Sequence, residues 1–142
     1  MKKIKSLFTL VLLFILIYSC SSDGNGEPSI YHRWPYKERT IDGVSYSYSY
    51  NGCNGEYIEF YGANKVQIVV IVNCEKNILA SGTFTKHDNV ITTTTKHLSN
   101  PPHTTTYYIT ELTQNTLTLW YGDYFVDENG MIVPYNQDKF ER

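Results

Sequence analysis

The feature that most constrains the fold is a period-two alternation of side chains that runs through the chain from Ile30 onward. The stretch 44–50, VSYSYSY, shows it most clearly, because apolar or aromatic residues alternate with serines. Successive side chains of a strand point to opposite faces of a sheet, so this stretch is typical of a half-buried strand. Helical spacing of apolar residues never persists beyond a turn. The alternation therefore predicts an all-β domain.

Turn signals rich in Gly, Asn, Asp and Pro recur every ten residues or so. We place one of them at 75–77, and Pro35 predicts a bent or edge-like first strand. The strand candidates between the turns are 32–41, 44–50, 56–61, 65–73, 78–86, 90–97, 104–112, 116–126 and 131–137. Short strands at this spacing are typical of an antiparallel sandwich or barrel. Because closure removes exposed edges, we predict a small antiparallel up-and-down barrel of about eight strands.

Two of these strands predict a disulfide. The runs 56–61 and 65–73 are joined by the loop 62–64, and a hairpin with this loop sets apolar residues opposite apolar ones and polar opposite polar. Continuing the register brings Cys53 to within one residue of the position opposite Cys74. In an oxidising compartment we expect these two cysteines to form a bridge. The alternatives are two separate buried thiols or a metal-binding pair.

The first twenty residues predict export. Three lysines precede an apolar run, Leu10–Ile17, that is too short to span a bilayer, and a small residue follows at Ser19. Because Cys20 comes next, the segment resembles a bacterial lipoprotein signal. That resemblance implies removal of residues 1–19 and attachment of fatty acyl chains, such as palmitate, to Cys20. The alternatives are an ordinary signal peptide that happens to contain a cysteine and an uncleaved signal anchor.

The rest of the sequence predicts one domain on a tether. Residues 20–29 are small and polar and form the expected lipidated tether, and residues 30–142 form the expected β-barrel domain. Twelve lysine and arginine residues less the three of the leader leave nine against fourteen acidic residues, a net charge of −5. This charge disfavours nucleic acid and an anionic membrane surface as partners. We expect a cell-envelope location, lipid-anchored at the outer membrane, on either its periplasmic or its outer face.

No group of residues in the sequence has the spacing of a known catalytic or metal site. The four histidines lack zinc-motif spacing, and we interpret them as surface or loop residues. Glu56 and Glu59 fall on opposite faces of one strand, so they do not form an acid–base pair. The sequence therefore predicts a protein that is not an enzyme and that carries no metal and no cofactor.

Several stretches are similar to the bacterial lipocalin-like lipoprotein domain. They are Trp34 in the first strand, Cys53 shortly before the third, Cys74, the stretch 82–84 (GTF) and the hairpin within 107–119. The hairpin is the most informative, because a threonine-containing strand, a polar turn and a leucine-containing strand follow one another. The resemblance implies an eight-stranded lipocalin-like barrel without a catalytic motif.

Tyrosine is the most distinctive residue, with thirteen in the chain. Tyr46, Tyr48 and Tyr50 are our candidates for a ligand site, because an aromatic wall with hydroxyl groups suits a small amphipathic molecule. The alternative is that they are ordinary core or surface residues of strands. The leading hypothesis is a non-enzymatic binding module that holds a small apolar or amphipathic ligand in the barrel. The second hypothesis is a protein-interaction module, such as a hydrolase inhibitor acting through loops like Leu98–His103.

Overall fold

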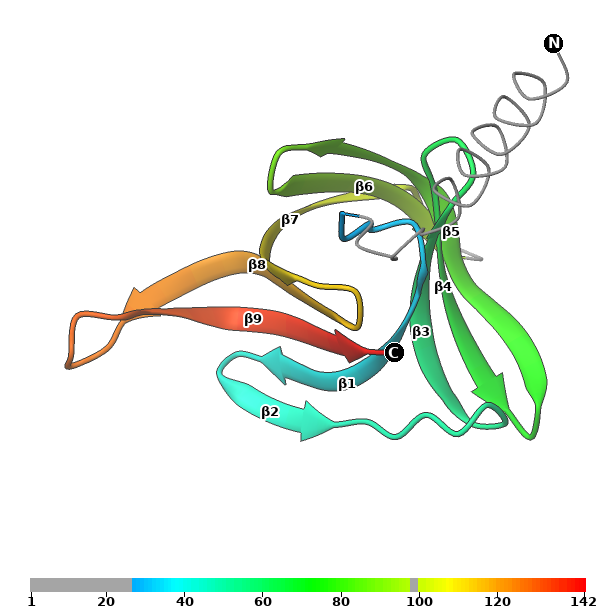
Figure 1. Cartoon of the computed structure of the whole chain (residues 1–142), viewed down its shortest axis with the longest axis horizontal. Helices are drawn as coiled ribbons and strands as arrows, with labels where there is room; N and C mark the ends of the chain where they lie inside the picture. The colour runs from blue at the N-terminus through cyan, green and yellow to red at the C-terminus, as the bar shows by residue number, and fades with distance from the viewer. Residues whose placement is uncertain (1–26, 98–99) are drawn as a thin grey trace, which may run out of the picture.

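Nine antiparallel strands form one sheet in the computed structural model, which describes residues 27–97 and 100–142 (Figure 1). They are β1 (Arg33–Ile41), β2 (Val44–Ser47), β3 (Gly55–Tyr61), β4 (Lys65–Val72), β5 (Glu75–His87), β6 (Val90–His97), β7 (His103–Leu112), β8 (Thr116–Val126) and β9 (Ile132–Glu141). Within these residues no helix has the length and apolar character needed to cross a membrane. The predicted signal peptide 1–19 and Cys20 lie outside the described residues, as does the tether up to residue 26.

Eight of the strands close into a barrel. β3 to β9 pair in sequence order, and β1 pairs with β3 on one edge and with β9 on the other. β2 pairs with the far half of β1 and lies outside the closed ring, where Figure 1 shows it in cyan. The predicted all-β, up-and-down barrel of about eight strands is confirmed.

The first strand changes partners at Pro35. Residues 33–35 pair with β3, and the same edge of β1 pairs with β2 from Glu38 onward. On the opposite edge, the register with β9 shifts between Tyr36 and Glu38, which marks a β-bulge. The extra residue moves Arg39, rather than Glu38, onto the face that carries Tyr36. The irregularity thus lies just after the proline, and it decides which side chains enter the barrel. The bent or edge-like strand expected from Pro35 stays a prediction.

The β3–β4 hairpin has the predicted register, with Phe60 opposite Val66 and Ile58 opposite Ile68. The turn predicted at 75–77 is wrong. The chain reverses two residues earlier, at Asn73 and Cys74, which both have positive φ angles of 53° and 66°. This is the backbone of the two-residue hairpin turns, and asparagine tolerates it better than most residues. Residues 75–77 consequently pair with β4 as the beginning of β5.

Two other strand ends differ from the prediction by more than one residue. β2 ends at Ser47 instead of residue 50, and all four of its residues are exposed, because no other element covers either face of it. β9 continues to Glu141 instead of ending at 137. Its last residues, including Asp138 and Phe140, pair with β1 and close the barrel. The charged residues Lys139 and Glu141 beside them make this stretch resemble ordinary surface sequence.

Large apolar side chains fill one part of the barrel interior. Trp34 is fully buried and donates its indole N–H to the Ile30 carbonyl oxygen at 2.9 Å. Phe60 and Phe84 meet edge to face with ring centroids 5.0 Å apart. Gly82 lets β5 approach β6 closely here, because a Cβ atom would lie 1.9 Å from the Thr94 carbonyl oxygen. Dense packing of this kind is the main stabilising contribution in a small domain.

Candidate functional site

The side chains that face the barrel interior change from apolar to polar along the strands. Because the strands are paired in register, the change occurs toward the same end of the barrel. The inward series are Trp34, Tyr36 and Arg39 in β1; Phe60, Ile58 and Glu56 in β3; Ile91, Thr93 and Thr95 in β6; Leu117, Leu119 and Tyr121 in β8; and Phe140 and Asp138 in β9. We call these two parts of the interior the apolar end and the polar end.

Arg39 lies at the centre of the polar end. Its Nε atom donates to Oδ1 of Asp138 at 2.8 Å, and its Nη2 atom lies 3.8 Å from Oε1 of Glu56. Its guanidinium also stacks over the Tyr36 ring, 4.3 Å from the centroid, and lies 5.9 Å from that of Tyr48. The Asp138 side chain is only 5% exposed, whereas those of Arg39 and Glu56 are 21% and 17% exposed. One cation is thus held between two carboxylates close to solvent.

The pKa values of these groups reflect burial first and the ion pairs second. Burial raises the pKa of Asp138, and the hydrogen bond and charge of Arg39 oppose that rise. Burial also raises the pKa of Glu56, again against the effect of Arg39. Burial pulls the pKa of Arg39 down, but Tyr36, Asp138 and Glu56 together raise it above its ordinary value. When all three groups are ionised, the cluster carries one net negative charge.

Tyrosine hydroxyl groups surround this cluster. Tyr107 and Tyr121 face each other across β7 and β8 with ring centroids 5.3 Å apart. Burial, followed by the nearby Asp138 charge, raises the pKa of Tyr121 to about 12 and raises that of Tyr107 as well. The nearby Thr105 and Thr93 side chains oppose the rise in the pKa of Tyr107. The polar end therefore offers neutral hydroxyl groups, aromatic faces and a slightly negative cluster.

The three tyrosines predicted to form one aromatic wall are not together. Tyr46 lies in β2 and is 51% exposed, while Tyr48 and Tyr50 lie beyond the end of that strand. Tyr48 packs against Tyr36 of the main core, whereas Tyr50 covers a second, smaller cluster that includes Tyr57. Tyr48 and Tyr50 do line one surface hollow of about 520 Å³, which Tyr46 does not reach. Of the three, Tyr48 adjoins the Arg39 cluster, and a ligand-binding role for any of them stays a prediction.

Cys53 and Cys74 form the predicted disulfide. The bridge joins the segment before β3 to the turn between β4 and β5, and the Cys74 amide also donates to the Cys53 carbonyl oxygen at 2.8 Å. It fixes the segment 48–54, which carries Tyr48 toward the barrel interior and Tyr50 over the β3–β4 hairpin. The bridge is structural support for the polar end rather than part of it.

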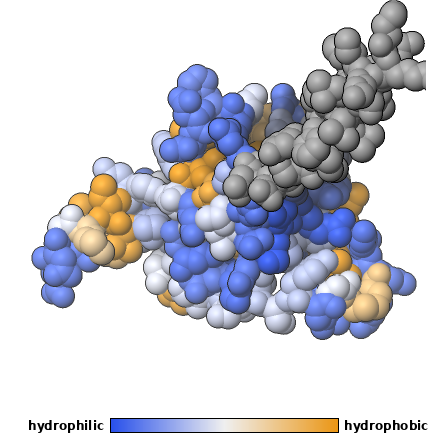
Figure 2. All heavy atoms as spheres, in the orientation of Figure 1, coloured by the Kyte–Doolittle hydropathy of each residue, from blue (hydrophilic) through white to orange (hydrophobic). Residues whose placement is uncertain are grey.

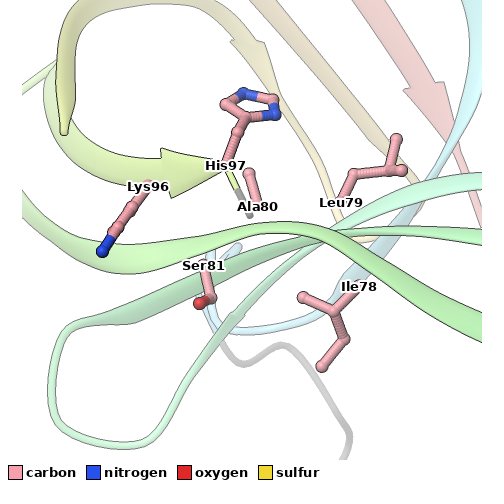
Figure 3. Close-up of a pocket in the computed structure, with 6 residues that line it drawn as sticks. All are labelled: Ile78, Leu79, Ala80, Ser81, Lys96 and His97. Carbon is pink, nitrogen blue, oxygen red and sulfur yellow. The ribbon is translucent and has the colours of Figure 1, made fainter. Parts of the chain in front are cut away.

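Another hollow, of about 400 Å³, lies where the middle of β5 passes the end of β6 (Figure 3). Figure 3 shows Ile78 to Ser81 along β5 with Lys96 and His97 beside them. Residues 98–99 of the predicted interaction loop Leu98–His103 lie outside the described part of the chain. The role predicted for that loop stays a prediction.

Histidines and acidic residues form no metal site in the described part of the chain, where no three His, Cys, Asp or Glu side chains come close enough to hold an ion. The four histidines are exposed there. Glu56 and Glu59 are on opposite faces, as predicted: Glu56 faces Arg39, whereas Glu59 accepts from Gln67 Nε2 at 2.6 Å and lies 3.5 Å from Arg33.

The sequence reasoning missed Arg39 and Asp138. They lie 99 positions apart, so local spacing gives no sign of their pairing. A weak signal was present in β9, where Asp138 and Phe140 share one face of a strand and a charge on an otherwise apolar face needs a partner. Placing Arg39 on the inner face of β1 requires knowledge of the bulge after Tyr36, and no residue pattern indicates that bulge.

Comparison with known proteins agrees with this architecture. No protein-family model matches the chain. No curated protein matches it either. Among solved structures, the fold is similar to that of a lipocalin-like protein from Bacteroides uniformis ATCC 8492, with a TM-score of 0.54. The match covers 80% of this chain and 97% of the other at 10% identity, a level that supports the fold alone. The closed eight-stranded barrel described here is thus a lipocalin-like fold.

Proposed function

We propose that this chain is a cell-envelope lipoprotein whose barrel is a non-enzymatic binding module for a small amphipathic molecule. The observation that carries the proposal is the cluster of Arg39, Asp138 and Glu56, which sits among tyrosines at the polar end of a lipocalin-like barrel. The mouths of β-barrels are common places for small-molecule sites, which combine aromatic walls with a few converging polar groups. The lipocalin-like fold supports a binding role at this level of detail.

The packing supports one orientation of such a ligand. At the apolar end Trp34, Phe60 and Leu117 are almost fully buried, so a long apolar group has little interior to occupy there. At the polar end Arg39, Glu56 and Tyr121 are partly exposed and within reach of a ligand. The ligand therefore places its polar group at this end. Because the cluster is net negative and Arg39 already pairs with two carboxylates, a cationic polar group fits better than an anionic one.

The membrane location belongs to the same proposal. It rests on the resemblance of the first twenty residues to a lipoprotein signal, which would attach Cys20 to the outer membrane through acyl chains. Metabolic labelling with a fatty-acid analogue is the direct test. Labelling of the wild-type protein but not of Cys20→Ala is expected, and an unlabelled wild type would remove the anchor from the proposal without affecting the barrel site.

Ligand binding is tested with two small amphiphiles that share a short butyl chain, butyltrimethylammonium and butyl sulfate. The purified full chain is expected to bind the cationic amphiphile more tightly, with NMR shift changes at Tyr107 and Tyr121. Glu56→Gln should weaken this binding, because it removes one carboxylate of the cluster. Glu59→Gln is the matched control, since Glu59 lies on the opposite face of the same strand. Equal effects of the two variants, or no binding, would contradict the proposal.

A further inference from the structure

The outer parts of β8 and β9 project beyond the barrel as a two-stranded ribbon, in orange and red at the left of Figure 1. β7 pairs with β8 as far as Tyr121, and the following residue, Gly122, has a φ angle of +76°. The pairing of β8 with β9 is also irregular between Tyr121 and Tyr124. The glycine therefore marks the point where the ribbon leaves the barrel. We call residues 122–135 the projecting hairpin.

Apolar side chains cover both faces of the projecting hairpin. In β8, Tyr124 and Val126 point to one face and Phe125 to the other, and their exposed fractions are 55%, 58% and 38%. Met131 and Ile132, at the start of the returning strand, are 64% and 58% exposed. Figure 2 shows a hydrophobic patch at the left of the molecule, between the hydrophilic tip of this hairpin and the barrel. Contiguous exposed apolar surface of this kind marks an interaction site in a soluble domain.

The two edges of the hairpin differ. The β9 edge is occupied, because the Gly43 amide donates to the Tyr135 carbonyl oxygen at 2.9 Å and the Asp42 amide donates to the Asn136 side chain. It also contains Pro134, which has no N–H to offer. Along the β8 edge, no described strand pairs with residues 122–126 on the side away from β9. Proteins usually protect such an edge with lysine or proline. This one has neither.

The charge of this region indicates what can pair with the free edge. From His97 to Asp138 the sequence contains no lysine or arginine but five acidic residues. Asp123 and Glu128 are exposed on the hairpin, whereas Asp127 uses its carboxylate to accept from the Asn129 and Met131 amides. A second copy of this hairpin would bring more carboxylates and no cation. An anionic lipid surface would be repelled in the same way.

We infer that the β8 edge at residues 122–126 accepts an extended segment of a protein partner, in which basic side chains alternate with apolar ones. The backbone of the added strand pairs with the free N–H and C=O groups of β8. Its apolar residues cover the aromatic side chains of the hairpin, and its basic residues pair with Asp123 and Glu128. This inference concerns a surface outside the barrel mouth, and it does not depend on the amphiphile site.

The test uses a fluorescein-labelled peptide that alternates lysine and valine, and the full chain in phosphatidylcholine nanodiscs. Binding is measured by anisotropy, with empty nanodiscs as the blank, and its position by hydrogen exchange of the complex. The peptide is expected to bind and to slow exchange of the amides within 122–126. A peptide with glutamate in place of lysine should bind at least several-fold more weakly. Asp123→Lys should weaken binding of the lysine peptide by about three- to tenfold at low salt.

Glu75→Lys supplies the matched control, because it makes the same charge change at an exposed position at the start of β5. The inference is overturned if the lysine peptide does not bind, if Glu75→Lys weakens binding as much as Asp123→Lys, or if the protected amides lie in β2 instead. It is equally overturned if sedimentation shows a dimer whose amides at 122–126 are already protected without peptide, since the occupant would then be a second copy.

Discussion

At the apolar end of the barrel, Trp34, Phe60 and Leu117 are buried to within about one per cent of their surface, whereas Arg39 and Glu56 at the polar end remain partly exposed. The same strands supply both groups. The apolar end gains stability from side chains that need no particular partner beyond close packing. The polar end depends on ion pairs and hydrogen bonds, and removing one partner leaves the other buried and unpaired, which is destabilising. Close packing and paired charges thus occupy opposite ends of one set of strands, and the proposed function places recognition at the charged end.

The largest effect is expected at the apolar end. Trp34→Ala should lower the free energy of unfolding by about 3–5 kcal/mol, because it empties a fully buried site and removes the hydrogen bond to Ile30. Urea unfolding followed by circular dichroism measures this loss. Trp120→Ala is the matched control on β8, where the side chain is only partly buried, and it should cost less than half as much. Equal losses would mean that the two positions do not differ in packing.

The disulfide should come next, because it holds the segment that leads from β2 to the polar end. Replacing both Cys53 and Cys74 with serine is expected to lower the free energy of unfolding by about 3 kcal/mol, the loop-entropy value for a bridge of this span. Guanidinium unfolding with and without reductant checks the assignment. Reductant should destabilise the wild type by a similar amount and leave the double variant unchanged, and a reductant effect on the double variant would refute this origin.

Arg39→Met tests whether the polar end depends on pairing. It should lower the free energy of unfolding by about 2 kcal/mol at neutral pH, because it leaves the Asp138 carboxylate buried without its cation. Arg39 normally lowers the pKa of Asp138, so that pKa should rise further in the variant. The folded variant then binds a proton at Asp138 more tightly than the unfolded chain does. The difference in unfolding free energy between the variant and the wild type should therefore shrink as the pH falls toward 4. Arg33→Met, at a more exposed ion pair, should cost under about 1 kcal/mol and show no such pH dependence.

Alkaline pH should affect the tyrosines near the cluster. Burial raises the pKa of Tyr36 well above 10.0 and that of Tyr121 to about 12. Unfolded tyrosines lose their protons first, so the unfolding free energy should fall from pH 10 toward pH 12, by about 1 kcal/mol per pH unit for a fully buried tyrosine. Tyr36→Phe should flatten this decline in stability curves measured from pH 10 to pH 12. An unchanged slope in Tyr36→Phe would contradict the assignment.

The smallest effect on stability is expected outside both ends. Phe125→Ser in the projecting hairpin should change the free energy of unfolding by less than about 0.5 kcal/mol, because the side chain is exposed and packs mainly on Tyr135. Thermal unfolding alongside the wild type measures it. A loss of unfolding free energy as large as that of Arg39→Met would mean that the hairpin stabilises the barrel and is not free to bind a partner.

The parts of the fold that local patterns determine were predictable from the sequence. Alternation and turn residues located most of the strands, and the β3–β4 register predicted the bridge between Cys53 and Cys74. The turn at Asn73 and Cys74 was missed, because its positive φ angles occur at residues other than glycine. A single glycine there would have placed the turn correctly.

The candidate site was less predictable, for a reason that lies in its geometry. Arg39 enters the barrel only because a bulge shifts β1 by one residue, and Asp138 becomes its partner only when β9 closes on β1. Tyr48 and Tyr50 were singled out by alternation, yet the chain leaves β2 between Ser47 and Tyr48 and sends the two rings to different clusters. Periodicity reports which face a residue occupies within a strand. It does not report where the strand ends.

The pairing of β1 with β9 also has a kinetic consequence. The barrel closes through contacts between residues about a hundred positions apart, such as Lys139 with Glu38. Contacts this distant in sequence form late, because their loop-closure entropy is paid before they contribute any stability. Until β9 has formed, the edge of β1 that pairs with it is open. The folding chain therefore passes through a state in which this edge can pair with another chain, and closure of the barrel ends that state.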